Sequence, residues 1–158
     1  DCLIGGPPCQ GFSKNVPAAY RFLEDPRNLL FRYYLDFVAV LRPRVVVMEN
    51  VAEIYKAYDG TVRDEILATL DRLGYRAIAK VMVASDYGVP QTRRRCLFFA
   101  SRTSVPPRFP DPTHGPAEHG ANGRKPRTSA WAAISDLPRL ENGEGFEPMD
   151  YDLAPQNE

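Results

Sequence analysis

Three short polar segments of this sequence hold side chains that could carry out chemistry together. The first is centred on Cys9, which follows the stiff run Gly5–Pro8 and precedes a polar stretch. A cysteine presented by such a turn acts as a nucleophile when positive charge nearby stabilises its thiolate. A lone cysteine is more often a small buried hydrophobe, so this alternative stands beside the nucleophile interpretation.

The second segment is Glu49-Asn50, which follows the apolar run Val45–Met48. We expect a carboxylate at the end of a buried strand to be partly desolvated, which suits a general acid. Composition alone favours the simpler alternative, in which Glu49 is a solvated residue that only ends the strand.

The third segment is the basic cluster Arg93–Arg95, which begins two residues after Gln91. In an extended segment Arg93 and Arg95 would share one face with Gln91, and Arg94 would lie on the other. This arrangement suits binding to a phosphate or a carbonyl oxygen. A solvated edge strand blunted by charge is the competing explanation.

Apolar periodicity in residues 1–102 predicts the elements that must position these side chains. Helices are expected at residues 28–41 and 61–73, and strands at residues 2–4, 45–48, 75–84 and 96–100. The second helix is expected to have Thr61 as N-cap and Gly74 as C-cap. Strands alternating with helices predict an α/β layered fold, and polar residues at strand ends form sites there. If the first two strands are neighbours, Cys9 and Glu49 share one crevice.

The remaining candidate ligands point to structural roles. Cys2 and Cys96 lie among apolar strand residues, and we expect both to be buried hydrophobes. Three cysteines without a C-x-x-C pair argue against a disulfide framework or a zinc site, and favour a reducing, cytosolic setting. The histidines, His114 and His119, have no further ligand at suitable spacing, so no metal is expected.

Composition and charge divide the chain near residue 102. The 158 residues are 44% hydrophobic, no apolar run is long enough for a membrane span, and the length fits one domain. Residues 1–102 hold 15 Lys/Arg and 11 Asp/Glu, a net charge of +4, whereas residues 103–158 hold 5 and 9, a net charge of −4. Nine of the 15 prolines lie in the second segment. We therefore expect a catalytic part at 1–102 and a Pro/Gly-rich connector at 103–158, with one short helix near 129–136.

Taken together, the three polar segments resemble the motifs of one enzyme family. The segment Gly6–Ser13 is similar to the Pro-Cys-Gln motif of DNA cytosine-5 methyltransferases. Glu49-Asn50-Val51 resembles their Glu-Asn-Val motif, and Gln91–Arg95 their Gln-x-Arg-x-Arg motif. Three motifs in the family's order are a specific signal. Residues 27–31 and 128–138 also resemble family segments, so the likeness extends from Asp1 to about Leu140.

The resemblance implies a partial Rossmann-like fold of the S-adenosylmethionine-dependent methyltransferases, comprising the C-terminal half of the sheet. It implies that the Cys9 thiolate adds to carbon 6 of cytosine, which makes carbon 5 nucleophilic. Glu49 would hydrogen-bond ring nitrogen 3 and the exocyclic amine, and Arg95 would contact the carbonyl oxygen of the base.

Further residues acquire roles by the same resemblance. Asn50 would brace the turn that carries Pro8, while Arg93 and Gln91 would order the catalytic loop or contact phosphate. Substrate contacts are also expected from Gln10 and from Ser13, which lies in the loop from Gly11 to about Arg27 that would close over the base. Leu30 would contact the cofactor.

The expected partners are S-adenosylmethionine as methyl donor and double-stranded DNA, from which the target base must be flipped. No metal and no membrane are expected, and the expected setting is the cytosol or nucleoid of a bacterium, in either a restriction–modification or a regulatory role. In the family, the cofactor-binding glycine motif would precede Asp1 and the target-recognition region would follow Glu158. We therefore expect the isolated chain to be inactive unless these parts are supplied in trans.

Three alternatives remain open on the sequence. One is a cytosine-5 methyltransferase that acts on transfer RNA, although Gly11-Phe12-Ser13 is more like the DNA branch. Another is a catalytically inactive paralogue that binds DNA or a partner protein, which would not need the nucleophile. The third is an α/β domain with a structural cysteine.

Overall fold

The computed structural model describes residues 1–8, 29–116, 123–138 and 140–145. The chain consists of two compact units. The first unit comprises residues 1–83 and 94–111, and the second comprises residues 84–93 and 112–158. The division expected near residue 102, between a catalytic part and a connector, stays a prediction.

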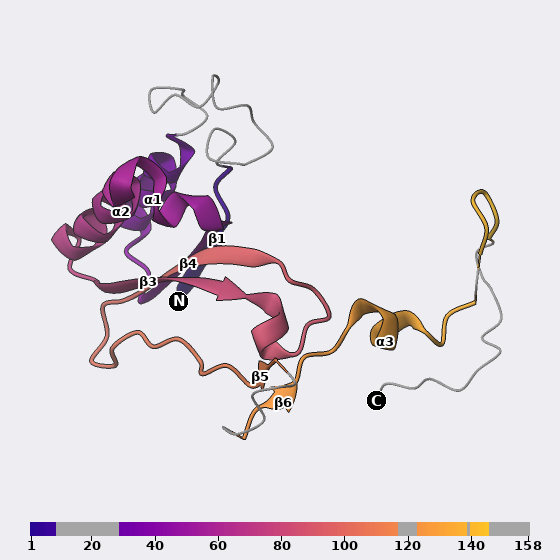
Figure 1. Cartoon of the computed structure of the whole chain (residues 1–158). Coiled ribbons are helices and arrows are strands. Elements are labelled where there is room, and N and C mark those ends of the chain that lie inside the picture. The colour runs from indigo at the N-terminus through magenta and orange to yellow at the C-terminus, as the bar shows by residue number, and fades with distance from the viewer. Residues whose placement is uncertain (9–28, 117–122, 139, 146–158) are drawn as a thin grey trace. The chain divides into compact units, whose positions relative to one another are not determined.

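The first unit contains a four-stranded sheet and two helices (Figure 1). Its elements are β1 (Cys2–Gly5), α1 (Leu30–Leu41), β2 (Val45–Val51), α2 (Thr61–Arg72), β3 (Arg76–Val83) and β4 (Arg94–Ser101), with 3-10 turns η4 (Ala52–Tyr55) and η5 (Ala57–Gly60) between β2 and α2. The strand order is β1-β2-β4-β3. Strand β1 is parallel to β2, whereas β4 is antiparallel to both of its neighbours. The predicted alternation of strands and helices is confirmed.

Strand β2 is longer than predicted, which changes the setting of its polar residues. It continues to Val51 because β4 pairs with it up to the register pair Val51↔Arg95. Glu49 and Asn50 therefore lie inside the strand and not after it, as the apolar run alone had indicated. An apolar run such as Val45–Met48 is typical of a parallel sheet, but among the described strands β2 has one parallel neighbour and one antiparallel neighbour.

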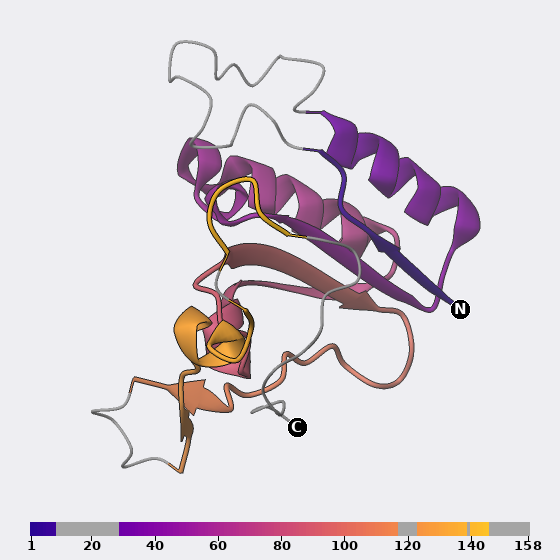
Figure 2. The ribbon, with the colours of Figure 1, turned by 90° about the vertical axis from the view of Figure 1, so that its right-hand side faces the viewer.

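One face of the sheet forms the hydrophobic core with both helices. Buried residues alternate along β2, and their register partners in β4 are buried on the same face. Figure 2 shows α1 and α2 on the same side of the strands. The core comprises Phe31, Tyr34, Leu35, Val38, Val46, Met48, Ile54, Val62, Ile66, Leu70, Tyr75, Cys96, Phe98 and Ala100. Each large apolar side chain buried here stabilises the fold by about 1.5–3 kcal/mol.

The ends of α2 differ in one respect from the expectation. Thr61 is the first helical residue, and Gly60 (φ 89°) occupies the N-cap position. The hydroxyl of Thr61 donates to the carbonyl of Tyr58 at 2.7 Å, so it closes the preceding turn and does not cap the helix. At the other end Gly74 adopts a left-handed conformation (φ 85°), as expected for the glycine that follows a helix.

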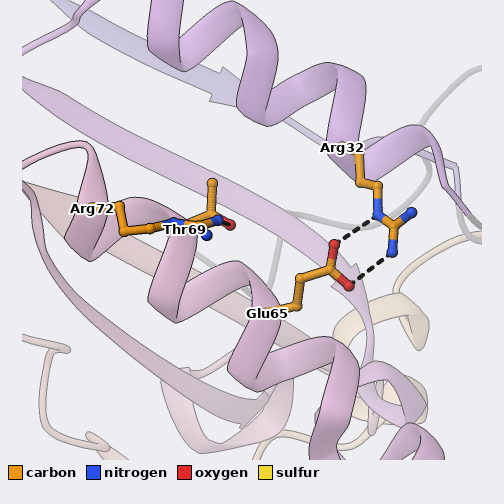
Figure 3. Close-up of polar contacts among 4 residues, drawn as sticks. All are labelled: Arg32, Glu65, Thr69 and Arg72. Atoms are coloured by element: carbon orange, nitrogen blue, oxygen red, sulfur yellow. Dashed lines mark hydrogen bonds and ion pairs between the residues drawn. The ribbon is translucent and has the colours of Figure 1, made fainter.

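An ion pair connects the two helices on their outer surface. Figure 3 shows the guanidinium of Arg32 on α1 facing the carboxylate of Glu65 on α2. The Arg32 Nε to Glu65 Oε1 distance is 2.6 Å, and the Nη2 to Oε2 distance is 3.0 Å. Along α2, Arg72 Nη2 donates to Thr69 Oγ1 at 2.8 Å. The two side chains of the ion pair are 49% and 33% exposed, so this pair contributes about 0–1 kcal/mol.

The two described cysteines differ in their surroundings. Cys96 is fully buried in the core, and this burial raises the pKa of its thiol to about 12. Cys2 was expected to be buried as well, but it is exposed. The reason is that β1 lies at the edge of the described sheet and is paired there only with β2, so few of the described elements cover its side chains.

The second unit contains short elements. They are η6 (Ala84–Tyr87), β5 (His114–Gly115), β6 (Lys125–Pro126) and α3 (Ala130–Ile134). The helix expected near 129–136 is confirmed in shorter form, with Ser129 as N-cap because its Oγ accepts a hydrogen bond from the N–H of Ala132 at 3.0 Å. Arg127 forms an ion pair with Asp86, whose backbone oxygen also accepts from Thr113 N at 2.9 Å.

Neither a metal site nor a membrane span is found in the described part of the chain. His114 contacts the hydroxyl of Thr113 through Nδ1 at 2.8 Å, and His119 lies outside the described part of the chain. Within that part, no group of three or more potential metal ligands is present. Likewise, none of the described helices has the length and apolar character needed to cross a membrane.

Candidate active site

The candidate site lies where β1 and β2 run side by side. Gly5 is in register with Met48, so the segment after β1 runs next to Glu49. A Cβ atom built on Gly6 would lie 3.4 Å from Glu49 Oε2, which shows that the carboxylate rests against the Gly6 backbone. The condition stated from the sequence, that the first two strands are neighbours, is thus met. Cys9 itself lies outside the described residues, and its place beside Glu49 stays a prediction.

Asn50 holds the segment after β1 against β2. Its Nδ2 donates to the carbonyl oxygen of Pro7 at 3.0 Å, and its Oδ1 accepts from the N–H of Val51 at 2.8 Å. The residue is only 3% exposed, so both ends of the amide need these partners. Asn50 was expected to brace the turn that carries Pro8, and its hydrogen bond is to Pro7, the residue before it.

Glu49 and Arg95 form an ion pair across β2 and β4. The distance from Arg95 Nε to Glu49 Oε1 is 2.6 Å. The register pairs Arg95 with Val51, two residues beyond Glu49, so the two charged side chains are diagonal neighbours on one face. A second bond, from Arg95 Nη1 to the carbonyl of Arg94 at 2.8 Å, fixes the orientation of the guanidinium. The Glu49 side chain remains 43% exposed, so its carboxylate is only partly removed from water.

Gln91 and Arg93, the other two residues expected to act with Arg95, belong to the second unit. Gln91 and Arg93 are exposed there, and the backbone oxygen of Arg93 accepts a hydrogen bond from Ala84 N at 2.9 Å. The face that they were expected to share with Arg95 therefore stays a prediction. Gln10 and Ser13 lie outside the described residues, as does the whole loop that would close over a base.

Comparison with known proteins places this chain in a family. The family described as C-5 cytosine-specific DNA methylase matches residues 1–148. The chain belongs to this family. It is 40% identical over 144 residues to the type II methyltransferase M1.HphI of Haemophilus parahaemolyticus, a match that covers 91% of this chain and 36% of the relative. It is 39% identical over 162 residues to M.DdeI of Desulfomicrobium norvegicum, covering 99% of this chain and 37% of the relative.

A solved structure supports the fold of this DNA methylase chain. A DNA modification methyltransferase encoded within an Escherichia coli prophage is 28% identical, with a TM-score of 0.62. The match covers 89% of this chain and 36% of that protein. The expected α/β class and partial Rossmann-like methyltransferase fold are confirmed. The chain spans about a third of the length of the relatives and the structure that it matches.

The family implies S-adenosylmethionine as methyl donor, and the expected contact of Leu30 with it stays a prediction. Leu30, the residue expected to contact the cofactor, begins α1 and is half-buried, so part of its apolar surface is open to a ligand. An apolar side chain can pack against a ligand but cannot bind its charged or hydroxyl groups. Those groups would need polar partners other than Leu30, so this residue could supply only part of the binding energy.

One buried residue beside the candidate site could not be singled out from the sequence. Tyr34 on α1 hydrogen-bonds both β1 and β2 next to the site. The adjacent glycines Gly5 and Gly6 were the only hint of this contact in the sequence, because a glycine at the end of a strand can mark the close approach of a bulky group. Gly5 faces the Tyr34 ring, and Gly6 faces Glu49.

Proposed function

We propose that this chain is the nucleophile-bearing part of a DNA cytosine-5 methyltransferase. The observation that carries the proposal is the position of the Glu49–Arg95 pair, with the Glu49 carboxylate resting on Gly6, three residues before Cys9. A nucleophile and an acidic group that act on the same base must be close enough for both to contact one cytosine ring. Membership of the DNA methylase family supports the same assignment.

Cys9 begins the proposed reaction as a thiolate. Its sulfur electron pair forms a bond to carbon 6 of the cytosine ring, and the electrons of the 5,6 double bond shift through the ring toward nitrogen 3. Glu49 acts here as the acid: its carboxyl O–H donates to nitrogen 3 and its other oxygen accepts from the exocyclic amine, which stabilises the negative charge that develops on the ring. Carbon 5 then accepts a methyl group. Loss of the proton from carbon 5 and of the Cys9 thiolate from carbon 6 restores the aromatic ring.

Arg95 has two parts in this proposal. Its Nε orients the Glu49 carboxylate through the contact at 2.6 Å, and its Nη1 is held by the Arg94 carbonyl. These two contacts engage two of the three guanidinium nitrogens. We assign the third, Nη2, to the carbonyl oxygen of the flipped cytosine. The positive charge there would also stabilise the thiolate form of Cys9 over its thiol form.

The methyl group would come from S-adenosylmethionine, whose sulfonium makes it an electrophile. Leu30 is the residue of this chain proposed to pack against that cofactor. The DNA substrate would be a duplex with the target base flipped out, at a cost of a few kcal/mol for unstacking. Further substrate contacts are proposed for Pro8, Gln10, Ser13 and Gln91, and Arg93 would order the catalytic loop or contact phosphate. Asn50, which is buried, would support substrate binding by bracing the segment that carries Pro8.

The biological setting is also a proposal. The relatives M1.HphI and M.DdeI are named type II methyltransferases, which supports a role in bacterial restriction–modification. We infer a bacterial cytosol or nucleoid as the place of action. Residues 103–158 would form the connector toward a target-recognition region.

A methylation assay tests the proposed function. The chain is placed in a complete methylase, in which a relative supplies the segments that lie before and after it, and is incubated with labelled S-adenosylmethionine. We expect label to appear as 5-methylcytosine in duplex DNA, to disappear in Cys9→Ala and to remain in the control Cys2→Ala. Label in transfer RNA and not in DNA would contradict the DNA substrate. Equal label in the Cys9→Ala variant would contradict the nucleophile.

A further inference from the structure

Tyr34 joins the two strands that lead to the proposed catalytic residues. It lies on α1 and is 9% exposed. Its hydroxyl is 3.1 Å from the carbonyl oxygen of Leu3 in β1 and 3.1 Å from that of Val47 in β2. A hydroxyl has a single proton to donate, so this proton is shared between the two carbonyls. One side chain thereby connects both strands at a fixed separation.

The ring of Tyr34 also contacts the end of β1. A Cβ atom built on Gly5 would lie 2.6 Å from Cε2 and 3.0 Å from Cδ2 of this ring. Real Cβ atoms essentially never approach other atoms as closely as the first of these distances, so position 5 holds no side chain while the ring is in place. Gly5 is therefore needed for close approach and not for a positive φ, since it is not among the glycines with positive φ.

Packing alone does not require the hydroxyl group. The neighbouring buried residues of α1 are Phe31, Leu35 and Val38, and a phenylalanine at position 34 would fill the same space. Burying a hydroxyl in such surroundings is unfavourable unless it finds hydrogen-bond partners. Burial raises the pKa of Tyr34 to about 12, so the group remains a donor throughout the physiological range.

We infer that Tyr34 is a positioning residue, which sets the separation between the segment that carries Cys9 and the strand that carries Glu49. This inference rests on the proposed function. Leu3 lies three residues before Gly6 in the Cys9 segment, and Val47 lies two residues before Glu49. Both groups must act on one cytosine ring, so a small change in the separation of the strands lowers the rate of the chemical step.

The test uses DNA that contains 5-fluorocytosine. Fluorine cannot leave carbon 5 as a proton does, so the enzyme stays covalently bound to the DNA after methyl transfer. The Tyr34→Phe variant of the complete methylase carrying this chain is compared with the wild type. Tyr33→Phe is the matched control, because Tyr33 is the adjacent residue on α1 and is 63% exposed. For each protein, the rate constant and the final amount of adduct are measured at saturating DNA and S-adenosylmethionine.

These two quantities separate a positioning role from a role in folding alone. We expect Tyr34→Phe to lower the rate constant by on the order of tenfold, with the final amount of adduct and the affinity for DNA unchanged. Tyr33→Phe should match the wild type. A wild-type rate constant in Tyr34→Phe would overturn the inference, as would a smaller amount of adduct formed at the wild-type rate. If the wild type forms no adduct, the proposed function itself is contradicted.

Discussion

At the scale of single residues, the proposed chemistry depends on how Arg95 presents its guanidinium. Nε binds Glu49 and Nη1 binds the carbonyl of Arg94. The planar guanidinium can make both contacts at once, and together they fix its orientation. A lysine keeps the charge but cannot make both contacts. We expect Arg95→Lys to lower the rate constant for methyl transfer by at least about tenfold, whereas Arg94→Lys, whose backbone still offers its oxygen, has a small effect. Single-turnover kinetics measures both, and equal effects in the two variants would contradict the assignment.

Asn50 is expected to matter for stability as well as for the site. Asn50→Ala removes the donor to Pro7 O and the acceptor for Val51 N, and leaves both backbone groups without these partners. The expected loss is about 1–3 kcal/mol in the free energy of unfolding, measured by urea denaturation. Asn142→Ala, at an exposed position, is the control and should change it little. A loss no greater than that of the control would show that the two hydrogen bonds are not formed.

The two described cysteines give a prediction about pH. Burial raises the pKa of Cys96 to about 12, so its thiol stays protonated in the folded protein at about pH 8–9, while Cys2 is exposed. Iodoacetamide should therefore label the Cys2 peptide and spare the Cys96 peptide, as read by mass spectrometry. Prompt labelling of Cys96 in the folded protein would contradict its burial.

The raised pKa of Cys96 also affects stability at high pH. Above the ordinary thiol pKa of 9.0, the unfolded state releases the Cys96 proton and the folded state does not. The free energy of unfolding should thus fall between about pH 9 and pH 12.

At the scale of elements, the end of β1 and helix α1 are fitted to each other. Gly5→Ala would place a methyl group against the Tyr34 ring, which must shift or push the strand away. We expect a loss of about 1–3 kcal/mol in the free energy of unfolding. The loss should be smaller in a Tyr34→Leu background, where the ring is absent. A double-mutant cycle measures this difference, and equal losses in both backgrounds would rule out the contact.

The sequence predicted the elements better than it predicted their ends. Periodicity located both helices and all four strands described in the first unit, because apolar faces must be buried whatever the neighbours are. It ended β2 too early, because only pairing with β4 reveals that Glu49 and Asn50 continue the strand. The exposure of Cys2 and the contacts of Tyr34 were likewise out of reach, since both depend on which strands are neighbours.

At the scale of the whole molecule, the chain corresponds to about a third of its relatives. It holds the Glu49–Arg95 pair, but only Leu30 is proposed to contact the cofactor. We expect the 158-residue chain alone to give no turnover in a methylation assay, and activity to return when the remaining parts of a related methylase are added. Turnover by the chain alone would contradict the proposal that most of the cofactor contacts come from parts of the methylase outside this chain.

The most direct test of the proposed nucleophile is to find the residue that becomes attached to the DNA. The complete methylase carrying this chain is trapped on 5-fluorocytosine DNA, digested, and analysed by mass spectrometry of the nucleotide-linked peptide. We predict that the cytosine is bonded to the sulfur of Cys9, in the peptide that contains Gly6-Pro7-Pro8. An adduct on Cys2, or a DNA-bound protein that never forms a covalent adduct, would contradict this assignment.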